Sequence, residues 1–161
     1  MGNDELVVKL TEVHGRCSYC GFERTLYFWY GNYGERIVST KDGSACAVAD
    51  LMKDNIVQEL VQYCAEILPP RQSDVAQNVL SRIVTDIYGI TCDDIEGKKA
   101  ETLSVTRCPN CLRWEIEEDE SFGERPKEIK VGYVTHHAWE KLDEKSKKLK
   151  ITKELSRQGY I

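Results

Sequence analysis

Two cysteine pairs with the same spacing constrain this 161-residue chain more than any other feature. Cys17 and Cys20 form one C-x-x-C pair, and Cys108 and Cys111 form the other. Two thiolates on a tight turn point at a single cation, and two such turns complete a tetrahedron. The spacing therefore predicts one shared metal site that joins two distant segments of the chain.

The same spacing also occurs in redox dithiols, where the first cysteine lies at a helix N-terminus that lowers its pKa. Here both pairs are followed by strand patterns, at residues 22–30 and 112–116, so no helix dipole is expected. We therefore favour a metal site over redox chemistry or two separate, inert pairs. Four thiolates leave no open coordination position, so such a site is structural rather than catalytic.

The two turns resemble the knuckles of zinc-ribbon domains, which are also found in rubredoxin. The resemblance rests on C-x-x-C-G at residues 17–21 and C-P-x-C at residues 108–111, and it covers only residues 5–30 and 101–118. It implies a structural metal and, in many members, contacts with macromolecules. Two features depart from the pattern. Leu112 stands where knuckles often have glycine, and 87 residues separate the pairs.

Zinc is the expected metal, because an all-cysteine site without other redox signals is most often structural zinc, and iron is the alternative. His14 precedes Cys17 by three residues and is a weaker candidate that would replace one cysteine ligand. His136 and Glu140 share a helix face but have no third ligand nearby, so an ordinary first-turn pair is the better interpretation.

The three other cysteines are not expected to form a second site. Cys46 and Cys64 fall within a helical pattern, Cys64 on its apolar stripe, where a free cysteine behaves as a small core residue. Cys92 lies beside Asp93 and Asp94, which raise the pKa of its thiol and argue against a nucleophile.

Hydrophobic periodicity predicts an α+β fold: a split antiparallel zinc ribbon with an inserted two-helix hairpin and a C-terminal helix. Period-two patterns predict strands at 5–13 and 22–30, a second cysteine hairpin at 103–116, and a further strand at 129–133. The aromatic residues of 25–30 lie on both faces of their strand. We expect both faces to be covered, by the helices and the Trp139 segment, rather than to form an open platform.

Apolar residues recur every four positions from Val48 to Leu68, which predicts one helix beginning near residue 44 and ending before two prolines. A second helix is expected from a Ser73 cap to a left-handed Gly89, antiparallel to the first. A last helix is expected after a Thr135 cap. The expected segments are a first ribbon half, a helical insertion, a second ribbon half and a basic C-terminal tail, at residues 1–43, 44–98, 99–135 and 136–161.

Charge is unevenly distributed along the chain. Residues 1–123 hold 12 Lys and Arg against 21 Asp and Glu, a net −9, whereas residues 124–161 hold 10 against 6, a net +4. A basic tail on an acidic body either reaches an acidic partner or folds back onto the body. We expect a protein partner, with nucleic acid as the alternative through this tail and a homodimer through the wide apolar stripes of the helices.

Several classes of protein are disfavoured by the composition. No apolar run is long enough for a membrane span, the N-terminus lacks a secretory signal, and seven cysteines argue against a disulfide framework, so we expect a cytoplasmic protein. No catalytic triad, phosphate-binding loop or H-E-x-x-H motif is present. The expected function is therefore a non-catalytic, zinc-stabilised interaction module, an accessory or regulatory factor. The alternative is a small metal-binding subunit of an enzyme complex or a rubredoxin-like electron carrier.

Overall fold

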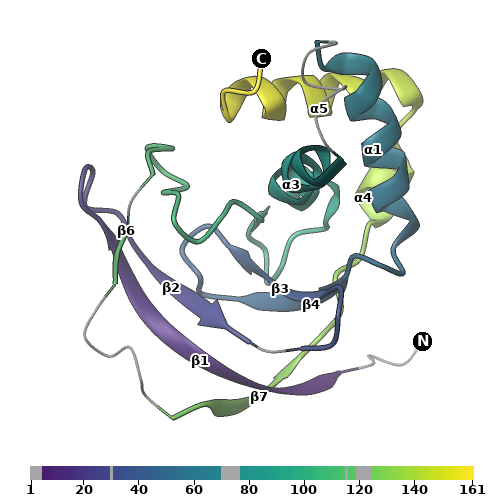
Figure 1. Cartoon of the computed structure of the whole chain (residues 1–161). Coiled ribbons are helices and arrows are strands. Elements are labelled where there is room, and N and C mark those ends of the chain that lie inside the picture. The colour runs from purple at the N-terminus through teal and green to yellow at the C-terminus, as the bar shows by residue number, and fades with distance from the viewer. Residues whose placement is uncertain (1–4, 30, 70–76, 115, 119–124) are drawn as a thin grey trace.

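The computed structural model describes residues 5–29, 31–69, 77–114, 116–118 and 125–161. It confirms a mixed α+β fold, in which two small antiparallel sheets lie on one side and the helices lie on the other (Figure 1). The two sheets and the helices that cover them bring the two cysteine turns to one end of the molecule.

The first sheet is built around one long strand, β1 (Leu6–Cys17). Its N-terminal half pairs with β7 (Lys127–Val131), and its C-terminal half pairs with β2 (Glu23–Phe28) and β6 (Ile116–Glu118), all antiparallel. Strands are therefore present at the predicted ranges 5–13 and 22–30, except that residue 30 lies outside the described residues, and the strand predicted at 129–133 begins two residues earlier. The second hairpin predicted at 103–116 was wrong as a pair of strands, because its described arms meet only in one bridge between Arg107 and Trp114, and β6 begins at Ile116. Because β1 continues to Cys17, the sheet itself places the first cysteine.

The second sheet corrects the prediction of a helix from residue 44. It contains β3 (Glu35–Thr40) between β4 (Cys46–Asp50) and β5 (Ala100–Glu101). The centre of β4 is buried as a continuous run, Ala47 to Ala49, as expected for a strand covered on both faces. A run of this kind cannot be distinguished from a buried helix by periodicity alone, which explains the error.

Helix α1 (Asn55–Ile67) begins only after the strand, where the Asp54 side chain accepts a hydrogen bond from the backbone N–H of Ile56. Helix α3 (Gln77–Ile87) follows, and the predicted Ser73 cap lies outside the described residues. Figure 1 shows α3 end-on and α1 across the view, so the two helices cross instead of running antiparallel.

Gly89 does not end α3 in a left-handed conformation, because the chain continues into a 3₁₀ helix, η1 (Tyr88–Thr91). The last predicted helix is also divided in two, into α4 (His137–Glu140) and α5 (Glu144–Arg157). Asp143 breaks the continuity because its side chain caps α5, accepting from the Ser146 N–H at 2.7 Å. At α4, Thr135 is not the cap, since Asp93 accepts the first N–H groups.

Two apolar clusters hold the layers together. The larger cluster lies among the helices and includes residues from both β3 and β4. The apolar stripes of α1 and α3 pack within this cluster. Its largest fully buried side chains are Leu60, Ile87, Tyr88, Trp139, Ile151 and Leu155. The smaller cluster lies between the two sheets and consists of Val8, Leu10, Val48 and Val131.

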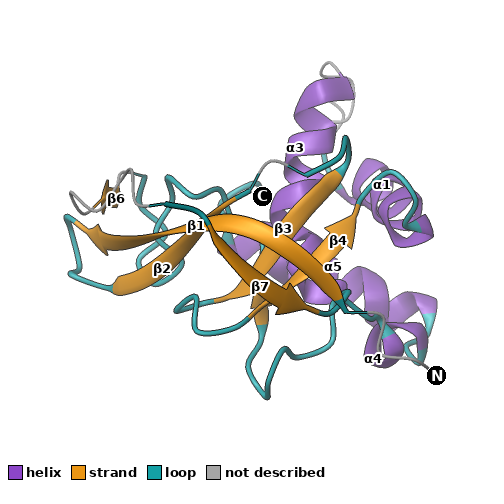
Figure 2. Cartoon of the chain, turned by 90° about the horizontal axis from the view of Figure 1, so that it is seen from below, coloured by secondary structure: helices purple, strands orange, loops and turns teal. Residues whose placement is uncertain are grey.

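Tyr27 and Trp29 of the aromatic strand region pack on the smaller cluster. The prediction that the helices and Trp139 cover this strand was therefore wrong, since Trp139 belongs to the helical cluster and the cover comes from the second sheet. Figure 2 shows that the two sheets cross each other and that the helices lie behind β3 and β4.

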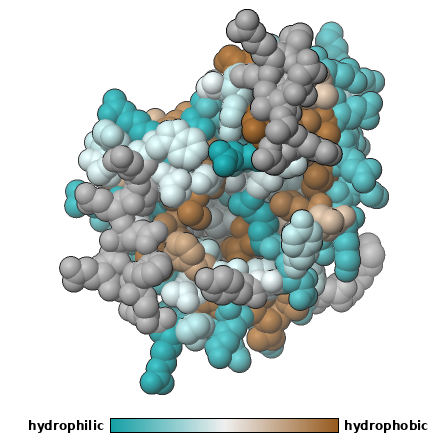
Figure 3. All heavy atoms as spheres, viewed as in Figure 1, coloured by the Kyte–Doolittle hydropathy of each residue, from teal (hydrophilic) through white to brown (hydrophobic). Residues whose placement is uncertain are grey.

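Hydrophobic residues are visible at the middle of the face shown in Figure 3 and also at its right and lower margins, interspersed with hydrophilic residues. Within the described part of the chain, no helix has both the length and the apolar character required to cross a membrane.

Candidate metal centre

All four predicted cysteines meet at one point at the end of the first sheet. The sulfur atoms of Cys17, Cys20, Cys108 and Cys111 all lie within 4.8 Å of one another. Two of these separations cross between the turns, with 3.6 Å between the Cys17 and Cys111 sulfurs and 3.7 Å between those of Cys20 and Cys108. Neither pair is a disulfide, whose S–S bond is about 2.05 Å long.

The spacing of the sulfurs matches a tetrahedral metal site. Four thiolates at about 2.3 Å from one ion, at tetrahedral angles, place their sulfurs about 3.8 Å apart. The separations of 3.6 and 3.7 Å between the turns lie close to that value. The donor set is also soft and complete, so the four cysteines could hold a metal ion without any further ligand.

The first knuckle, residues 17–22, continues directly from β1. The N–H of Gly21 donates to the carbonyl of Cys17 at 2.9 Å, and the N–H of Cys17 donates to the carbonyl of Phe22 at 2.9 Å. Gly21 has a φ of 74°, in the left-handed region that glycine adopts without a steric penalty. This conformation lets the chain turn directly after Cys20.

The second knuckle, residues 108–113, has the same backbone. The N–H of Leu112 donates to the carbonyl of Cys108 at 2.8 Å, and the N–H of Cys108 donates to the carbonyl of Arg113 at 2.9 Å. Leu112 has a φ of 64°, so it adopts the conformation of Gly21 despite its side chain. Leucine in place of glycine therefore makes the turn less stable but leaves its geometry unchanged.

Asn110 supplies hydrogen bonds to the sulfurs. Its backbone N–H lies 3.4 Å from the Cys108 sulfur, and its side-chain Nδ2 lies 3.6 Å from the Cys20 sulfur. The Lys41 ammonium donates to Asn110 Oδ1 at 3.2 Å, which orients the amide with its NH₂ group toward the sulfur. Such donors offset thiolate charge and hold the ligands in place.

Two buried arginines support the second knuckle from below, and sequence reasoning missed them both. Arg24 donates to the carbonyls of Val105 and Arg107 at 2.7 and 3.1 Å. Arg107 donates to the carbonyls of Leu112 and Gln158 at 2.8 and 2.7 Å. Burial lowers the pKa of Arg24, and the nearby Cys108 thiolate opposes this shift. A positive charge beneath four thiolates stabilises their ionised form.

The thiols of the cluster differ in acidity. The hydrogen bond from Asn110, helped by the backbone N–H of Phe22, lowers the pKa of Cys20 to about 6. Burial instead raises the pKa of Cys108 to about 11. Hydrogen bonding at the exposed Cys20 and desolvation at the buried Cys108 therefore shift the two pKa values in opposite directions.

The other predicted candidates lie elsewhere. His14 is outside the cysteine cluster, and its Nε2 faces Glu23 Oε2 at 4.0 Å. Cys64 is buried in the helical core as predicted, whereas Cys46 lies on β4 instead of a helix. Burial raises the pKa of Cys92 to about 12, and the neighbouring carboxylates reinforce that direction.

His136 does not pair with Glu140. Instead it joins a buried network, in which Nδ1 lies 2.8 Å from the Thr91 carbonyl and Nε2 lies 2.7 Å from Asp54 Oδ2. The Tyr88 hydroxyl also donates to Asp54 Oδ2, at 2.5 Å. Burial opposes ionisation of Asp54, yet the bonds from Tyr88, the Ile56 N–H and His136 lower its pKa. The network pins the start of α1 to η1 and α4.

The basic C-terminal segment folds back onto the acidic body. The Lys147 ammonium lies 2.9 Å from Glu59 Oε1, and the Lys148 ammonium lies 2.7 Å from Glu66 Oε2. Arg157 similarly pairs with Glu101 at 3.3 Å. Several cations that the sequence offered for nucleic acid are thus engaged within the protein.

Comparisons with known proteins add no family to this description. No family model, curated protein or solved structure matches the chain. The candidate site therefore rests on the geometry of the four cysteines.

Proposed function

We propose that this protein is a non-catalytic interaction module stabilised by a structural zinc ion, an accessory or regulatory factor that binds a protein partner. The observation that carries the proposal is the closed set of four sulfurs within 4.8 Å. Zinc is favoured over iron because an all-thiolate site without other redox signals most often holds structural zinc. A complete coordination sphere leaves no position for a substrate.

The contact surface we propose lies on the two knuckles and is called the knuckle surface here: Tyr19, Val105, Arg113 and Trp114. Tyr19 is 54% exposed and Trp114 is 51% exposed. The Arg113 guanidinium carbon lies 4.7 Å from the centre of the Tyr19 ring, so the tyrosine is held in one orientation. Tyr, Trp and Arg are the side chains that most often anchor protein interfaces.

A protein partner is preferred to nucleic acid because the cations near the C-terminus are largely consumed by internal ion pairs. Lys147 and Lys148 pair with glutamates of α1, and the chain as a whole carries a net charge of −5. Binding to nucleic acid requires a cationic surface that neutralises several phosphates. Arginine beside aromatic rings also suits unpaired bases, so salt dependence must decide between the partners.

The rubredoxin-like alternative has one observation in its favour, which is that Cys20 is an exposed residue. An exposed ligand offers a short route for electron transfer. Elemental analysis and a visible absorption spectrum of the purified protein distinguish the zinc module from the electron carrier. Ferric thiolates absorb visible light, whereas zinc thiolates do not. We expect one zinc per chain and no visible absorption. One iron per chain with reversible bleaching on reduction would replace this proposal by the electron carrier.

The interaction itself is tested by isolating the protein with its co-purifying partner and comparing variants. Tyr19→Ala combined with Trp114→Ala should abolish the complex while the zinc content and melting temperature stay unchanged. Tyr33→Ala is the matched control, because Tyr33 is 89% exposed and belongs to the connection between β2 and β3, outside both knuckles. A complex that survives the double substitution, or that dissociates only as salt rises and contains nucleic acid, would contradict the proposed surface.

A further inference from the structure

The four cysteines of the metal centre differ in how far solvent reaches them. Cys20 is an exposed residue and Cys111 is half-buried, whereas Cys17 and Cys108 are only 2% and 0% exposed. Oxidation of cysteine by a dissolved reagent follows exposure and thiolate character. An oxidant in the surrounding water therefore meets Cys20 before the other three ligands.

Two features of the cluster prepare Cys20 for oxidation. A thiol that binds a metal is deprotonated, and the thiolate is the form that peroxide oxidises. The Cys108 sulfur, on the other knuckle, lies 3.7 Å from the Cys20 sulfur. Redox-sensing cysteines often have such a neighbour, which converts the first oxidation product into a disulfide.

The second knuckle has the freedom of movement that this disulfide requires. An S–S bond is about 2.05 Å long, so the two sulfurs must approach by roughly 1.6 Å. At the base of the second knuckle, the described residues form a single bridge, between Arg107 and Trp114. Cys108 can therefore shift once no metal holds it, whereas the ladder between β1 and β2 keeps the first knuckle in place.

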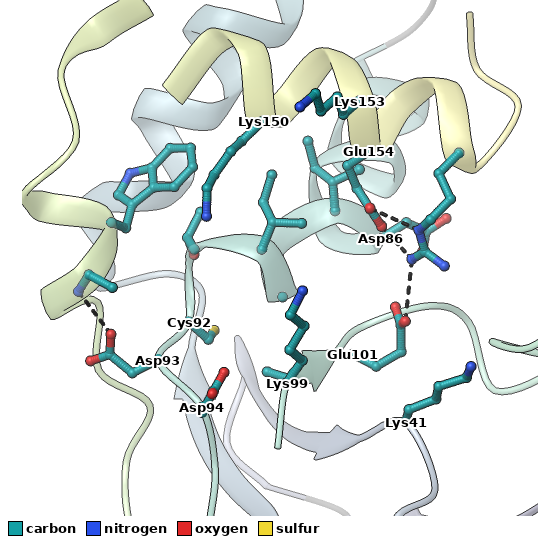
Figure 4. A pocket seen from close by; sticks show the side chains of 18 of the residues that line it. Lys41, Asp86, Cys92, Asp93, Asp94, Lys99, Glu101, Lys150, Lys153 and Glu154 are labelled. Carbon is teal, nitrogen blue, oxygen red and sulfur yellow. Dashed lines mark hydrogen bonds and ion pairs between the residues drawn. The ribbon is translucent and has the colours of Figure 1, made fainter. Parts of the chain in front are cut away.

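The cysteines outside the cluster do not compete for the oxidant. Cys92 lines the open cleft between α5 and residues 86–101, and in the described part of the chain no other cysteine lines that cleft (Figure 4). Burial raises the pKa of Cys46 to about 11 and the pKa values of Cys64 and Cys92 to about 12. These thiols stay protonated near neutral pH, and a protonated thiol is a poor nucleophile.

We propose that Cys20 is a site of oxidation by hydrogen peroxide, with Cys108 as the cysteine that completes a disulfide and expels the metal. This inference rests on the proposed zinc site. The Cys20 thiolate attacks one peroxide oxygen, so that an S–O bond forms, the O–O bond breaks and hydroxide leaves. The Cys108 thiolate then attacks the Cys20 sulfur, an S–S bond forms, the S–O bond breaks and a second hydroxide leaves. Two thiolates thus lose the two electrons that peroxide gains.

The disulfide removes the zinc because it leaves too few ligands. Only the Cys17 and Cys111 thiolates remain, whereas a structural zinc site has four protein ligands. Loss of zinc also alters the knuckle surface, which spans both turns: the Arg113 guanidinium carbon lies 4.7 Å from the centre of the Tyr19 ring. Oxidation therefore weakens the proposed contact with a partner.

The test treats the full-length, zinc-loaded protein with hydrogen peroxide while a chromophoric chelator reports free zinc. We expect release of the bound zinc together with loss of two thiol groups per chain. Mass spectrometry of proteolytic peptides should then show a Cys20–Cys108 disulfide. A dithiol reductant followed by zinc should restore both the thiols and the bound metal, because a disulfide is a reversible product.

Two matched variants locate the reaction, because histidine can replace one cysteine in a four-ligand zinc site. Cys20→His removes the exposed thiolate and should slow zinc release by peroxide at least about tenfold. Cys111→His is the control, because it keeps both Cys20 and Cys108, and its rate should stay within about threefold of that of the unsubstituted protein. If either variant fails to bind zinc, the disulfide map of the unsubstituted protein decides alone.

Several outcomes would overturn the inference. Equal rates in the two variants would show that Cys20 is not the site of attack. A disulfide within one knuckle, between Cys17 and Cys20, would exclude Cys108 as its partner. A protein that binds zinc and retains it under peroxide contradicts this inference alone, whereas a protein that binds no zinc contradicts the proposed function as well.

Discussion

The first knuckle stands on a regular hairpin, whereas the second is held mainly by side chains. Strands β1 and β2 pair continuously from Thr11 and Phe28 down to Arg16 and Glu23, next to the first turn. At the base of the second turn, the described residues form a single bridge, between Arg107 and Trp114. The same turn geometry is therefore reached once through a ladder of backbone hydrogen bonds and once through buried arginines and the cysteine cluster.

This difference predicts that the second knuckle depends more on the metal than the first. A ladder of backbone hydrogen bonds persists when a ligand is lost, because each bond is supported by its neighbours. In the second turn, Leu112 adopts a left-handed conformation, and the energy this costs destabilises the turn. Four substitutions or treatments test the contrast, beginning with the largest expected effect.

Removing the metal should have the largest effect. Structural zinc contributes about 10–16 kcal/mol in small zinc peptides, which is comparable to the about 5–15 kcal/mol that stabilise a domain. Chelation, Cys17→Ser or Cys108→Ser should therefore lower the melting temperature sharply. In hydrogen exchange, the amides of Cys108 and Leu112 should lose protection before those of Val13 and Leu26. An unchanged melting curve after complete chelation would rule out a structural metal.

Arg107→Met should have the next largest effect. It removes two buried hydrogen bonds from a charged donor, to the carbonyls of Leu112 and Gln158. We expect the free energy of unfolding to fall by about 3 kcal/mol in urea titrations of the metal-loaded protein. Arg113→Met is the control: its exposed side chain stacks on Tyr19, so its cost should be below about 1 kcal/mol. Equal losses would show that buried arginine does not support the turn.

Asn110→Ala should weaken metal binding without unfolding the protein. It removes the Nδ2 donor that lies 3.6 Å from the Cys20 sulfur. Loss of such a supporting contact typically reduces metal affinity about tenfold. Competition with a chromophoric chelator measures this change. Tyr19 occupies the equivalent position of the first knuckle, and Tyr19→Ala should leave the affinity unaltered. A similar loss in both variants would argue that the two turns bind the metal through equivalent contacts.

Gly21→Ala should have the smallest effect, about 1 kcal/mol, because a Cβ is unfavourable at a φ of 74°. The cost is conformational, since the nearest atom to that Cβ would be the flexible Arg16 side chain at 3.7 Å. Gly132→Ala is the control, because Gly132 has no positive φ and a Cβ there would meet nothing within 4 Å. If both changes cost the same in thermal unfolding, the left-handed conformation carries no penalty at Gly21.

The sequence by itself determined the four clustered cysteines, the α+β class and strands β1, β2 and β7 of the first sheet, whereas β6 begins only where the strand predicted at 112–116 ends. These features depend on local rules. The C-x-x-C spacing requires two sulfurs on one turn, and alternation over residues 5–13 reports one buried and one exposed face. Pro69 and Pro70 likewise marked the end of a helix, and α1 ends at Ile67, two residues before them.

The tertiary structure alone decided which elements cover one another and which charges remain free. The run from Cys46 to Asp50 became a strand because β3 and the loop at Tyr133 supply backbone partners that no local pattern encodes. Arg24 and Arg107 look like ordinary surface residues in sequence, and only burial beneath the second knuckle gives them their role. The same holds for the lysines of α5. Lys147 and Lys148 are neutralised by α1, whereas Lys150 faces an open cleft, because an ion pair depends on what lies across the helix, which the order of residues along it does not specify.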